Sequence, residues 1–464
     1  MAAPRALRGG RLLVALFALG LVVRLVVLWN TSGLEAKIAD ERDYVRLADG
    51  ILAGRGFVSD SGQPTSLRPP LYPALVAGTW SVAGPRNMQA VRAVQIVLAA
   101  LTAWLVFELG RRAFDSRVGA WAAIVVWLYP ELVFFNFTIL TETLYTLLLV
   151  ASVLLSVMLV QKPRASTAVA CGLALGLGTL TRSVLWPLPF VLCPLLAFMV
   201  QGSLRHRVAV PALVLAGYAV VITPWAVRNT RLQGVVTIVD TMGGMNLRMG
   251  NYEHTPNERM WDAASIEGER NWVYALSQEG HPAGAAITEG QKEKWAQRKA
   301  IEYMLANPGV TVRRAFIKFS DFWGLERTFI AGLQHGLYSP PRWFGILGAG
   351  LVLLSCTSVL LFGVAGLWLV RPGWRAHVLL LLPVSAIMVA HTIVFGHPRY
   401  HVPLVPILAL YACAVVPAFL SGALRRDLVA LGTFASAAAL LLIWTRQTIF
   451  VDGQQVRALF RGLM

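Results

Sequence analysis

The stretch RLLVALFALGLVVRLVVLWN, residues 11–30, is apolar apart from three polar positions. A helix that crosses the hydrocarbon core of a bilayer needs about 20 mostly apolar residues, and this stretch supplies them. Similar runs continue along the chain, and the expected spans cover residues 11–29, 88–108, 117–136, 139–160, 167–182, 184–200, 208–226, 343–369, 377–395, 400–420 and 428–445. The sequence therefore predicts an α-helical polytopic membrane protein with about 11 transmembrane helices.

Composition agrees with a membrane protein. Of the 464 residues, 56% are hydrophobic and only 14% are charged, whereas soluble domains carry about 25% charged residues. The first run is expected to remain as an anchor, because it is longer than the apolar part of a cleaved signal peptide and no small-residue cleavage motif follows it. The cysteines lie inside apolar runs without metal-type spacing, so we expect packing residues rather than disulfides or a zinc site at Cys171, Cys193, Cys356 and Cys413.

The net charge is +17, and its positive residues follow the expected membrane topology. Every second loop is basic, through Arg5, Arg8, Arg11, Arg111, Arg112, Arg117, Lys162, Arg164, Arg205, Arg207, Arg371, Arg375, Arg425 and Arg426. Because Lys and Arg accumulate in cytoplasmic loops, the N-terminus is expected to be cytoplasmic and the C-terminus outside. This alternation accounts for much of the charge, so nucleic acid is not an expected partner.

Two segments are too polar to span a membrane, and both fall outside on this topology. The expected domains are residues 1–226, with helices 1–7 and a first outer loop at 31–87; residues 227–342, an extracytoplasmic domain; and residues 343–464, with helices 8–11 and an outer tail. The outer domain is expected to be small and mixed α/β, because a strand-like run at 234–240 precedes a Gly-Gly turn and two helical patterns.

The first outer loop opens with IADERDYVRLADGILAGRGF, residues 38–57. Its apolar residues recur with helical spacing, so we expect an amphipathic helix along the membrane surface, with Asp40 as N-cap and Gly54 ending it. Asp40 and Glu41 would then lie level with the lipid headgroups. In the plainer alternative, Asp40 only caps the helix and Glu41 is a solvated acid in its first turn.

Other ionisable residues approach the same outer face from apolar runs, where charge is costly and indicates function. Glu142 and Arg182 lie near the outer ends of such runs, Arg228 follows one, and His397, Arg399 and His401 stand at the start of another. Arg68 joins them from the first outer loop, where it precedes PPLYP. Each alone could be an interfacial anchor, but together they place acids and cations at one depth. This combination suits sugar transfer from a polyprenyl phosphate, since a carboxylate can deprotonate the attacking hydroxyl while arginines hold the departing phosphate. Such a displacement is expected to invert the anomeric carbon, by analogy with inverting glycosidases.

The sequence resembles the GT-C glycosyltransferases related to protein O-mannosyltransferases and to the lipid A aminoarabinose transferase. The resemblance rests on DERDYVRLADGILAGRGF followed by SLRPPLYPAL, and on TETLY, LTR, TPWAVRN, GGMNLRMGN and HPRYHVPLVPILAL in this order. It covers most of the chain. It implies a polyprenyl-phosphate-sugar donor, a hydroxyl acceptor on a lipid, glycan or protein, and a bacterial inner membrane with the active site facing the periplasm or cell exterior.

The resemblance also implies roles for individual residues. Asp40 would be the catalytic base with Glu41 beside it, and Glu142 matches a position where Asp is usual in the aminoarabinose-transferase branch. Contacts to the donor phosphate are expected from Arg68, Arg182, Arg399 and His397. Contacts to the acceptor or the loops are expected from Tyr44 and Arg228. Asn246 and Asn251 of the outer domain are further candidates if that domain binds acceptor, whereas in the plainer alternative the domain only caps the membrane body. No metal or other cofactor is expected, because nothing in the sequence resembles a dedicated metal cage.

Three other functions remain open at this point. A transporter or flippase for a lipid-linked sugar would place charges along a midplane path with repeat symmetry. An O-antigen ligase or polymerase would share the donor lipid but depend on a large late outer loop. A non-catalytic membrane scaffold would need none of these charges.

Overall fold

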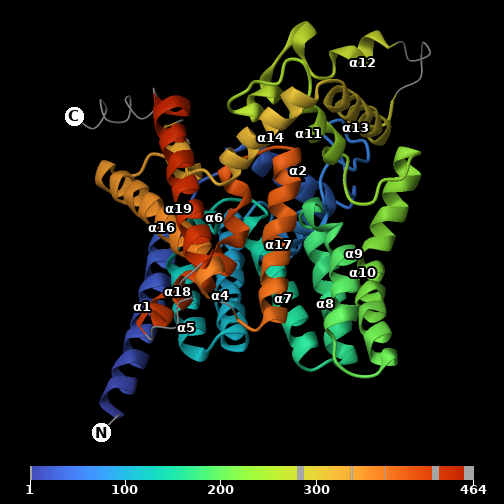
Figure 1. Ribbon diagram of the computed structural model, residues 1–464. Coiled ribbons are helices and arrows are strands. Elements are labelled where there is room, and N and C mark those ends of the chain that lie inside the picture. Colours follow the sequence, from blue (N-terminus) through green and yellow to red (C-terminus); the bar gives the residue numbers. More distant parts are fainter. Residues whose placement is uncertain are drawn as a thin grey trace.

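The computed structural model describes residues 3–279, 287–334, 336, 338–370, 372–420 and 428–453. Within them the regular elements are helical, and the only β pairing is an isolated antiparallel bridge between Val58 and Pro64. The helices form a body of roughly antiparallel rods that is covered at one end by shorter helices (Figure 1). We call that end the capped side and the opposite end the basic side.

The helical body contains α1 (Ala3–Asn30), α4 (Met88–Ala113), α5 (Ser116–Leu128), α6 (Pro130–Phe135), α7 (Glu142–Gln161), α8 (Ala165–Thr179), α9 (Leu188–Met199), α10 (Leu204–Gln233), α16 (Arg342–Leu369), α17 (Trp374–Ile393), α18 (Val405–Leu420) and α19 (Leu428–Arg446). Two helices of the first loop lie on the capped side, α2 (Ala39–Leu52) and α3 (Leu71–Ala83). Residues 234–341, the capping segment, contribute α11 (Met242–Met249), α12 (Tyr274–Gln278), α13 (Glu289–Ala306), α14 (Pro308–Phe322) and α15 (Thr328–Gln334). Short 3₁₀ turns include Ser183–Leu185, Met260–Ser265, Gly268–Arg270, Pro398–Tyr400 and Val402–Leu404, and a π turn covers Gln447–Val451.

Eight helical stretches in the described chain are long and apolar enough to cross a membrane. They are Gly10–Asn30, Met88–Ala113, Glu142–Gln161, Leu204–Gln233, Arg342–Leu369, Trp374–Ile393, Pro398–Phe419 and Ala430–Val451. The other three expected spans fall on shorter apolar helices, Ser116–Leu128, Ala165–Thr179 and Ser183–Met199. Prolines explain two of the short helices: Pro130 and Pro187 interrupt apolar runs, because proline lacks a backbone donor and disfavours helical geometry in the residue before it. A multi-pass membrane protein is supported, but the count of 11 is not confirmed.

Glycines allow neighbouring helices of the body to approach closely. A Cβ added to Gly172 on α8 would meet the carbonyl oxygen of Val214 on α10 at 2.1 Å, and one added to Gly217 would meet the carbonyl oxygen of Val169 at 2.6 Å. Small residues at such contacts are typical of membrane helices, whose association depends on close packing rather than on exclusion of water. The Gly-rich sequence of α8 thus fixes its position against α10.

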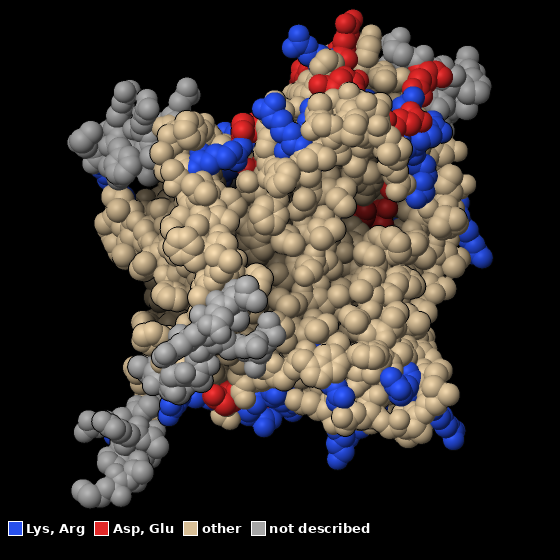
Figure 2. All heavy atoms as spheres, viewed as in Figure 1, with Lys and Arg blue, Asp and Glu red and all other residues tan. Residues whose placement is uncertain are grey.

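Charge is distributed unevenly over the two ends. Figure 2 shows Lys and Arg along the basic side, whereas acidic and basic residues are mixed over the capping segment. Arg371, Arg425 and Arg426 lie outside the described residues, as do the side chains of Arg5 and Arg8. Arg24, inside α1, makes an inward polar contact: its Nε donates to Asn136 at 2.9 Å and its guanidinium lies 3.7 Å from the ring centre of Trp127.

The capping segment differs from the expected mixed α/β domain. Residues 234–240 form bends and coil, and the Gly-Gly sequence read as a turn lies within α11. A Cβ on Gly244 would meet the carbonyl oxygen of Glu293 at 2.3 Å, so this glycine lets α11 pack against α13. The strand expected before it has no partner strand among the described residues, which explains why the run stays irregular.

Candidate active site

Helix α2 differs in one detail from its expected start. Its N-cap is Ile38, so Asp40 lies within the first turn rather than capping the helix. Gly54 adopts φ +70° just beyond the C-cap and ends the helix as expected. The buried face of α2 includes Tyr44, Leu47 and Ala48, which hold the helix against the body. The side chain of Asp40 is thereby free to turn toward the cations on neighbouring segments.

Six ionised side chains meet beneath the capping segment, and we call them the charge cluster. Its members are Asp40, Asp43, Arg68, Glu142, Arg182 and Arg399. Three carboxylates and three guanidiniums balance in formal charge. They come from the first loop, the start of α7, the turn after α8 and the turn before α18, so segments as much as 359 residues apart meet here.

Asp40 forms ion pairs with two arginines. Its Oδ1 lies 2.7 Å from Nη2 of Arg68, and its Oδ2 lies 3.1 Å from Nη1 of Arg399. Arg68 also donates through Nη2 to Asp43 at 2.8 Å. Because the Asp40 side chain keeps 31% of its surface exposed, it remains within reach of a substrate.

Glu142 forms the deeper half of the cluster. It is the first residue of α7 and its side chain is fully buried. Its Oε1 accepts a hydrogen bond from Nε of Arg399 and lies 3.3 Å from Nη2 of Arg182, while Oε2 has no hydrogen-bond partner in the described structure. Arg399 therefore bridges Asp40 and Glu142, and Arg182 reaches the cluster only through Glu142.

The environment keeps Asp40 ionised. Burial alone would raise the pKa of its carboxyl group, but the positive charges of Arg399 and Arg68 outweigh burial and lower that pKa to about 2. Burial alone would lower the pKa of Arg68, but Tyr44, Asp40 and Asp43 outweigh burial and raise that pKa further above its usual value. At neutral pH, Asp40 is therefore a carboxylate and its neighbour Arg68 a permanent cation.

Glu41 faces away from this charge cluster. Its Oε2 accepts from the backbone N–H groups of Lys37 and Ile38 at 2.8 and 2.9 Å, and its Oε1 accepts from the N–H of Ile139 at 2.9 Å. These contacts cap α2 and fasten it to the segment before α7. The two adjacent carboxylates therefore have different surroundings: Glu41 holds the helix in place, and Asp40 faces the arginines.

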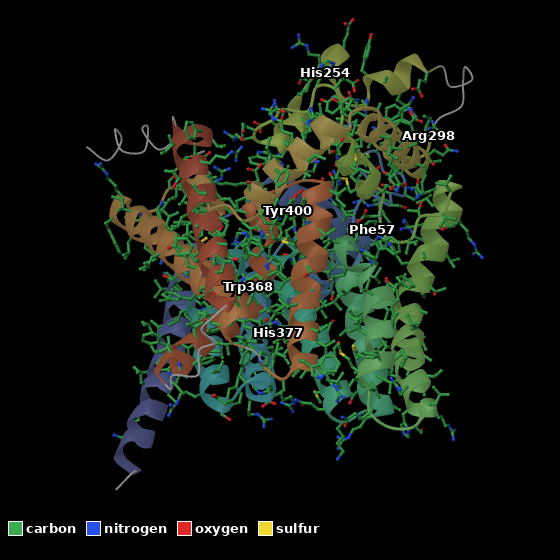
Figure 3. All side chains as sticks on the ribbon, in the orientation of Figure 1. Phe57, His254, Arg298, Trp368, His377 and Tyr400 are labelled. Carbon is green, nitrogen blue, oxygen red and sulfur yellow. The ribbon has the colours of Figure 1, made fainter. Side chains whose placement is uncertain are left out.

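Aromatic rings surround the arginines. The guanidinium of Arg68 lies 5.7 Å from the ring centre of Tyr44, and that of Arg182 lies 5.5 Å from Tyr145 and 5.9 Å from Tyr400. Figure 3 shows Tyr400 at the capped end of the body, just below the capping segment. Such faces attract cations and limit their side-chain freedom. Tyr44 was expected here from the sequence, whereas Tyr145 and Tyr400 were not singled out.

His397 has a different setting from the one expected. Its Nδ1 accepts from the backbone N–H of Arg399 at 3.0 Å, and its ring packs edge-on against Trp261 at 4.7 Å. Burial, aided by the charges of Arg327 and Arg399, holds the pKa of His397 well below its usual range. The neutral ring brings no positive charge to a phosphate, and its observed contact instead shapes the turn that carries Arg399.

Arg228 contacts loop backbone. Its Nη1 donates to the carbonyl oxygen of Thr65 at 2.7 Å, and its guanidinium lies 4.6 Å from the ring centre of Trp225. Arg228 thus ties the first loop to α10, as a loop contact rather than a member of the charge cluster.

The capping segment is fastened to the same loop. Glu289, the first residue of α13, accepts from the hydroxyl of Thr65 at 2.6 Å and from the backbone N–H of Ser66 at 2.7 Å. Thr65 and Ser66 precede Arg68 by three and two residues. The loop that carries Arg68 is therefore anchored on both the body and the capping segment.

The two asparagines proposed as acceptor contacts lie in or next to α11. Asn246 is half-buried on α11, and Asn251 is buried just beyond it. The amide of Asn251 donates to the carbonyl oxygens of Leu247 and Ile393, at 2.9 and 3.1 Å, and its oxygen accepts from Lys318 at 2.7 Å. Asn251 thus joins the capping segment to the end of α17.

Asp43 is the cluster member that the sequence analysis did not single out. It follows Asp40 by three residues, and this spacing puts both carboxylates on one side of a helix. Because Arg68 was expected near Asp40, the three-residue spacing could have indicated that Asp43 also pairs with the guanidinium of Arg68.

Residues 67–227 match the family described as dolichyl-phosphate-mannose-protein mannosyltransferase. The resemblance to GT-C glycosyltransferases is therefore confirmed. The matched residues include Arg68, Glu142 and Arg182 of the charge cluster. The matched segment thus carries half of the cluster.

Solved structures of GT-C enzymes are similar to the chain at low identity. The Archaeoglobus fulgidus oligosaccharyltransferase solved with Zn and sulfate aligns at 14% identity and a TM-score of 0.49, over 93% of this chain and 52% of the archaeal one. ArnT from Cupriavidus metallidurans bound to undecaprenyl phosphate aligns at 16% identity and a TM-score of 0.40, over 86% of this chain and 78% of ArnT. The chain thus spans about half the length of the archaeal enzyme. No curated protein sequence matches significantly.

Proposed function

We propose that this protein is an inverting glycosyltransferase that moves a sugar from a polyprenyl-phosphate donor to a hydroxyl acceptor at the outer face of a membrane. The observation that carries the proposal is the position of Asp40 between Arg68 and Arg399, at the capped end of an apolar helical body. A base next to two phosphate-binding cations is what this transfer requires.

In the proposed reaction, Asp40 accepts the proton of the acceptor hydroxyl while the hydroxyl oxygen attacks the anomeric carbon. The bond between that carbon and the phosphate oxygen breaks, and polyprenyl phosphate leaves with the bonding electron pair. Arg68 and Arg399 would stabilise the negative charge on the departing oxygen. Attack on the face opposite the phosphate inverts the anomeric carbon.

Donor binding would also prepare the base. In the structure, both guanidiniums are engaged with Asp40. A phosphate that draws them away would weaken the interaction that lowers the pKa of Asp40, making the carboxylate a stronger base when substrate is present. Glu142 would retain Arg399 and Arg182 in position during this exchange, because it is fully buried and contacts both.

Family resemblance and neighbours support the donor class. The family is described by its dolichyl-phosphate-mannose substrate, and one neighbour was solved with undecaprenyl phosphate and another with a dolichol-phosphate. The basic residues on the side opposite the charge cluster favour an active site on the outer face, in bacteria the periplasmic side of the inner membrane.

The deciding experiment offers purified protein in nanodiscs a panel of radiolabelled polyprenyl-phosphate sugars with candidate acceptors, and follows release of polyprenyl phosphate. Wild type should turn over one donor, and Asp40→Asn should lose roughly 10²- to 10⁴-fold in rate while still binding it. Equal turnover by both proteins would refute Asp40 as base. Transport of intact donor without release would favour a flippase, and transfer of a preassembled glycan would favour an O-antigen ligase or polymerase.

A further inference from the structure

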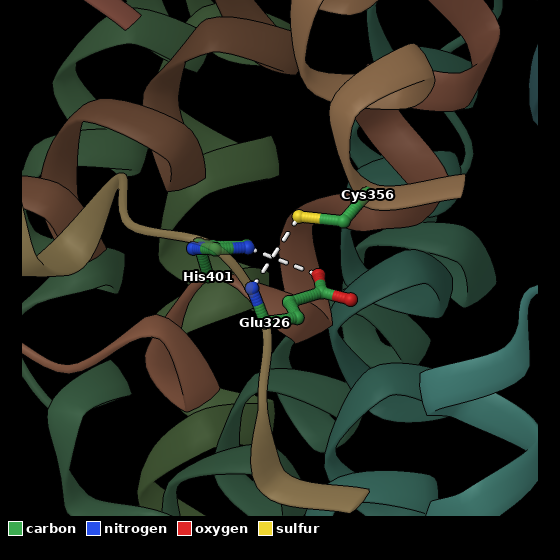
Figure 4. A group of neighbouring side chains, drawn as sticks. All are labelled: Glu326, Cys356 and His401. Atoms are coloured by element: carbon green, nitrogen blue, oxygen red, sulfur yellow. Dashed lines mark hydrogen bonds and ion pairs between the residues drawn. The ribbon is translucent and has the colours of Figure 1, made fainter. Parts of the chain in front are cut away.

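A second cluster of chemically active side chains lies apart from the charge cluster. Glu326 follows α14, Cys356 lies on α16 and His401 precedes α18, and Figure 4 shows the three side chains converging. One ligand atom from each lies within 4.8 Å of the other two, and the three residues are essentially inaccessible to solvent. The side chains offer sulfur, nitrogen and oxygen, which are the ligand atoms that zinc uses in proteins.

The hydrogen bonds around the three residues orient their lone pairs toward one point. Nδ1 of His401 lies 2.5 Å from the carbonyl oxygen of Phe322, which can only accept, so Nδ1 carries the proton. A neutral imidazole then turns the lone pair of Nε2 toward Oε1 of Glu326, 2.9 Å away. Two lone pairs at that separation need a cation between them, either a proton or a metal ion.

The surrounding contacts resemble the outer shell of a metal site. A metal-bound histidine usually donates its second N–H to a carbonyl or carboxylate, and His401 does so. Oε2 of Glu326 accepts from the hydroxyl of Tyr129 at 2.8 Å, which leaves Oε1 for the shared point. The thiol of Cys356 lies 3.4 Å from the backbone nitrogen of Glu326.

A second buried carboxyl group lies beside the three residues. Glu131 on α6 is fully buried and close enough to Glu326 for electrostatic repulsion. Its Oε1 accepts from the N–H of Thr328 at 2.9 Å, while Oε2 has no hydrogen-bond partner in the described part of the chain.

The geometry points to a binding site for a divalent transition metal of the zinc class, held by Glu326 Oε1, Cys356 Sγ and His401 Nε2. Ligand atoms around tetrahedral zinc lie about 3.3–3.8 Å apart, so the three atoms need to shift by about 1 Å. Binding would release the thiol proton and the proton shared by His401 and Glu326 to solvent. The sequence spacing had indicated packing cysteines only, because the three ligands come from segments far apart in the chain.

This site would serve positioning rather than proton transfer. It joins the segment between α14 and α15, which carries Glu326, to α16 and to the turn before α18. His401 follows Arg399 by only two residues. A metal would therefore fix the turn that presents Arg399 to Asp40. This consequence rests on the proposed function, but the metal site itself does not.

The test measures metal in protein that was purified through a non-histidine tag without chelator. Wild type is expected to contain about one zinc per chain by elemental analysis, and apoprotein titrated with Co(II) should show a thiolate-to-cobalt charge-transfer band. Cys356→Ala should lose both signals. The matched control, Cys413→Ala, changes a cysteine on α18 outside the cluster and should keep them, as should Asp40→Asn.

Tyr129→Phe provides a second variant if Cys356→Ala does not fold. It removes the hydroxyl that hydrogen-bonds Glu326 and contacts Cys356, and keeps all three ligand side chains. It should weaken zinc binding roughly 10- to 100-fold, measured in competition with a chromophoric chelator. Wild type without stoichiometric metal and without a cobalt–thiolate band would overturn the proposal, leaving a proton-sharing network. Turnover of donor lipid by metal-free protein would remove the positioning role but not the site.

Discussion

Arg399 binds Asp40 and Glu142 at once, and so joins the start of α2 to the start of α7 from a position near the end of the chain. The single guanidinium connects an accessible carboxylate to a fully buried one. In the proposed function, Asp40 would release Arg399 to the donor phosphate, whereas the buried Glu142 would keep Arg399 in place. This division of roles leads to the predictions below.

Arg68→Ala should weaken binding of the phosphate lipid. Loss of one charge-assisted contact is worth a factor of roughly 10 to 100 in affinity. Thermal stabilisation by added donor measures this loss, since a ligand that binds the folded state raises the melting temperature. Arg86→Ala is the control. Arg86 also pairs with an acid of α2, Asp49, but its side chain is exposed and lies outside the charge cluster. Unchanged donor stabilisation in Arg68→Ala would remove Arg68 from the phosphate site.

Glu41→Gln should reduce stability rather than chemistry. The side chain accepts three backbone N–H bonds, and an amide can replace only part of that acceptor capacity. We expect a loss of about 1–3 kcal/mol and a lower melting temperature, with the turnover of the remaining folded protein retained. Glu35→Gln, at an exposed position of the same loop, should be neutral. A variant of normal stability with abolished turnover would instead make Glu41 a participant in the reaction.

The ion pairs of Asp40 predict a pH dependence of stability. Its pKa is about 2 in the folded protein and about 3.9 in an unfolded chain. A lowered pKa stabilises the fold above the unfolded value, and that contribution disappears as pH falls through the folded value. The melting temperature of wild type minus that of Asp40→Asn should thus be steady from pH 7 to about 4 and shrink below it. A difference that vanishes between pH 7 and 5 would contradict the lowered pKa.

Gly172→Ala should loosen the contact between α8 and α10. The new Cβ would lie 2.1 Å from a carbonyl oxygen, so the helices must separate. Overpacking of this kind costs about 1–3 kcal/mol, and the yield of folded protein in detergent should fall with the melting temperature. Gly78→Ala on α3 has open space around the added carbon and serves as control. Equal stability of the two variants would show that the helices adjust freely.

Sequence reasoning found most of the charge cluster because charge within apolar runs is rare and physically expensive. Glu142, Arg182 and Arg399 stand out by that criterion, whereas Arg68 was singled out by the resemblance of SLRPPLYPAL. All four contact other cluster members. Asp43 was missed because acids on the polar face of a helix are ordinary. The difference between Asp40 and Glu41 could not be read from adjacency, since it depends on the N–H of Ile139, about a hundred residues away.

The fold was predictable where helices depend on apolar runs and less so where they depend on tertiary contacts. Prolines shortened helices that composition alone had extended. Gly244 was read as a turn residue, although it allows two helices to touch. The grouping of Glu326, Cys356 and His401 carries no local signature, because each side chain is unremarkable among its sequence neighbours.

The bonds from Glu289 to Thr65 and Ser66 bear on how chimaeric proteins of this kind should be built. A capping segment grafted from a relative would arrive without the loop residues that α13 binds. The boundaries of an exchange that preserves the site therefore lie in two places, and residues 65–66 must travel together with α13.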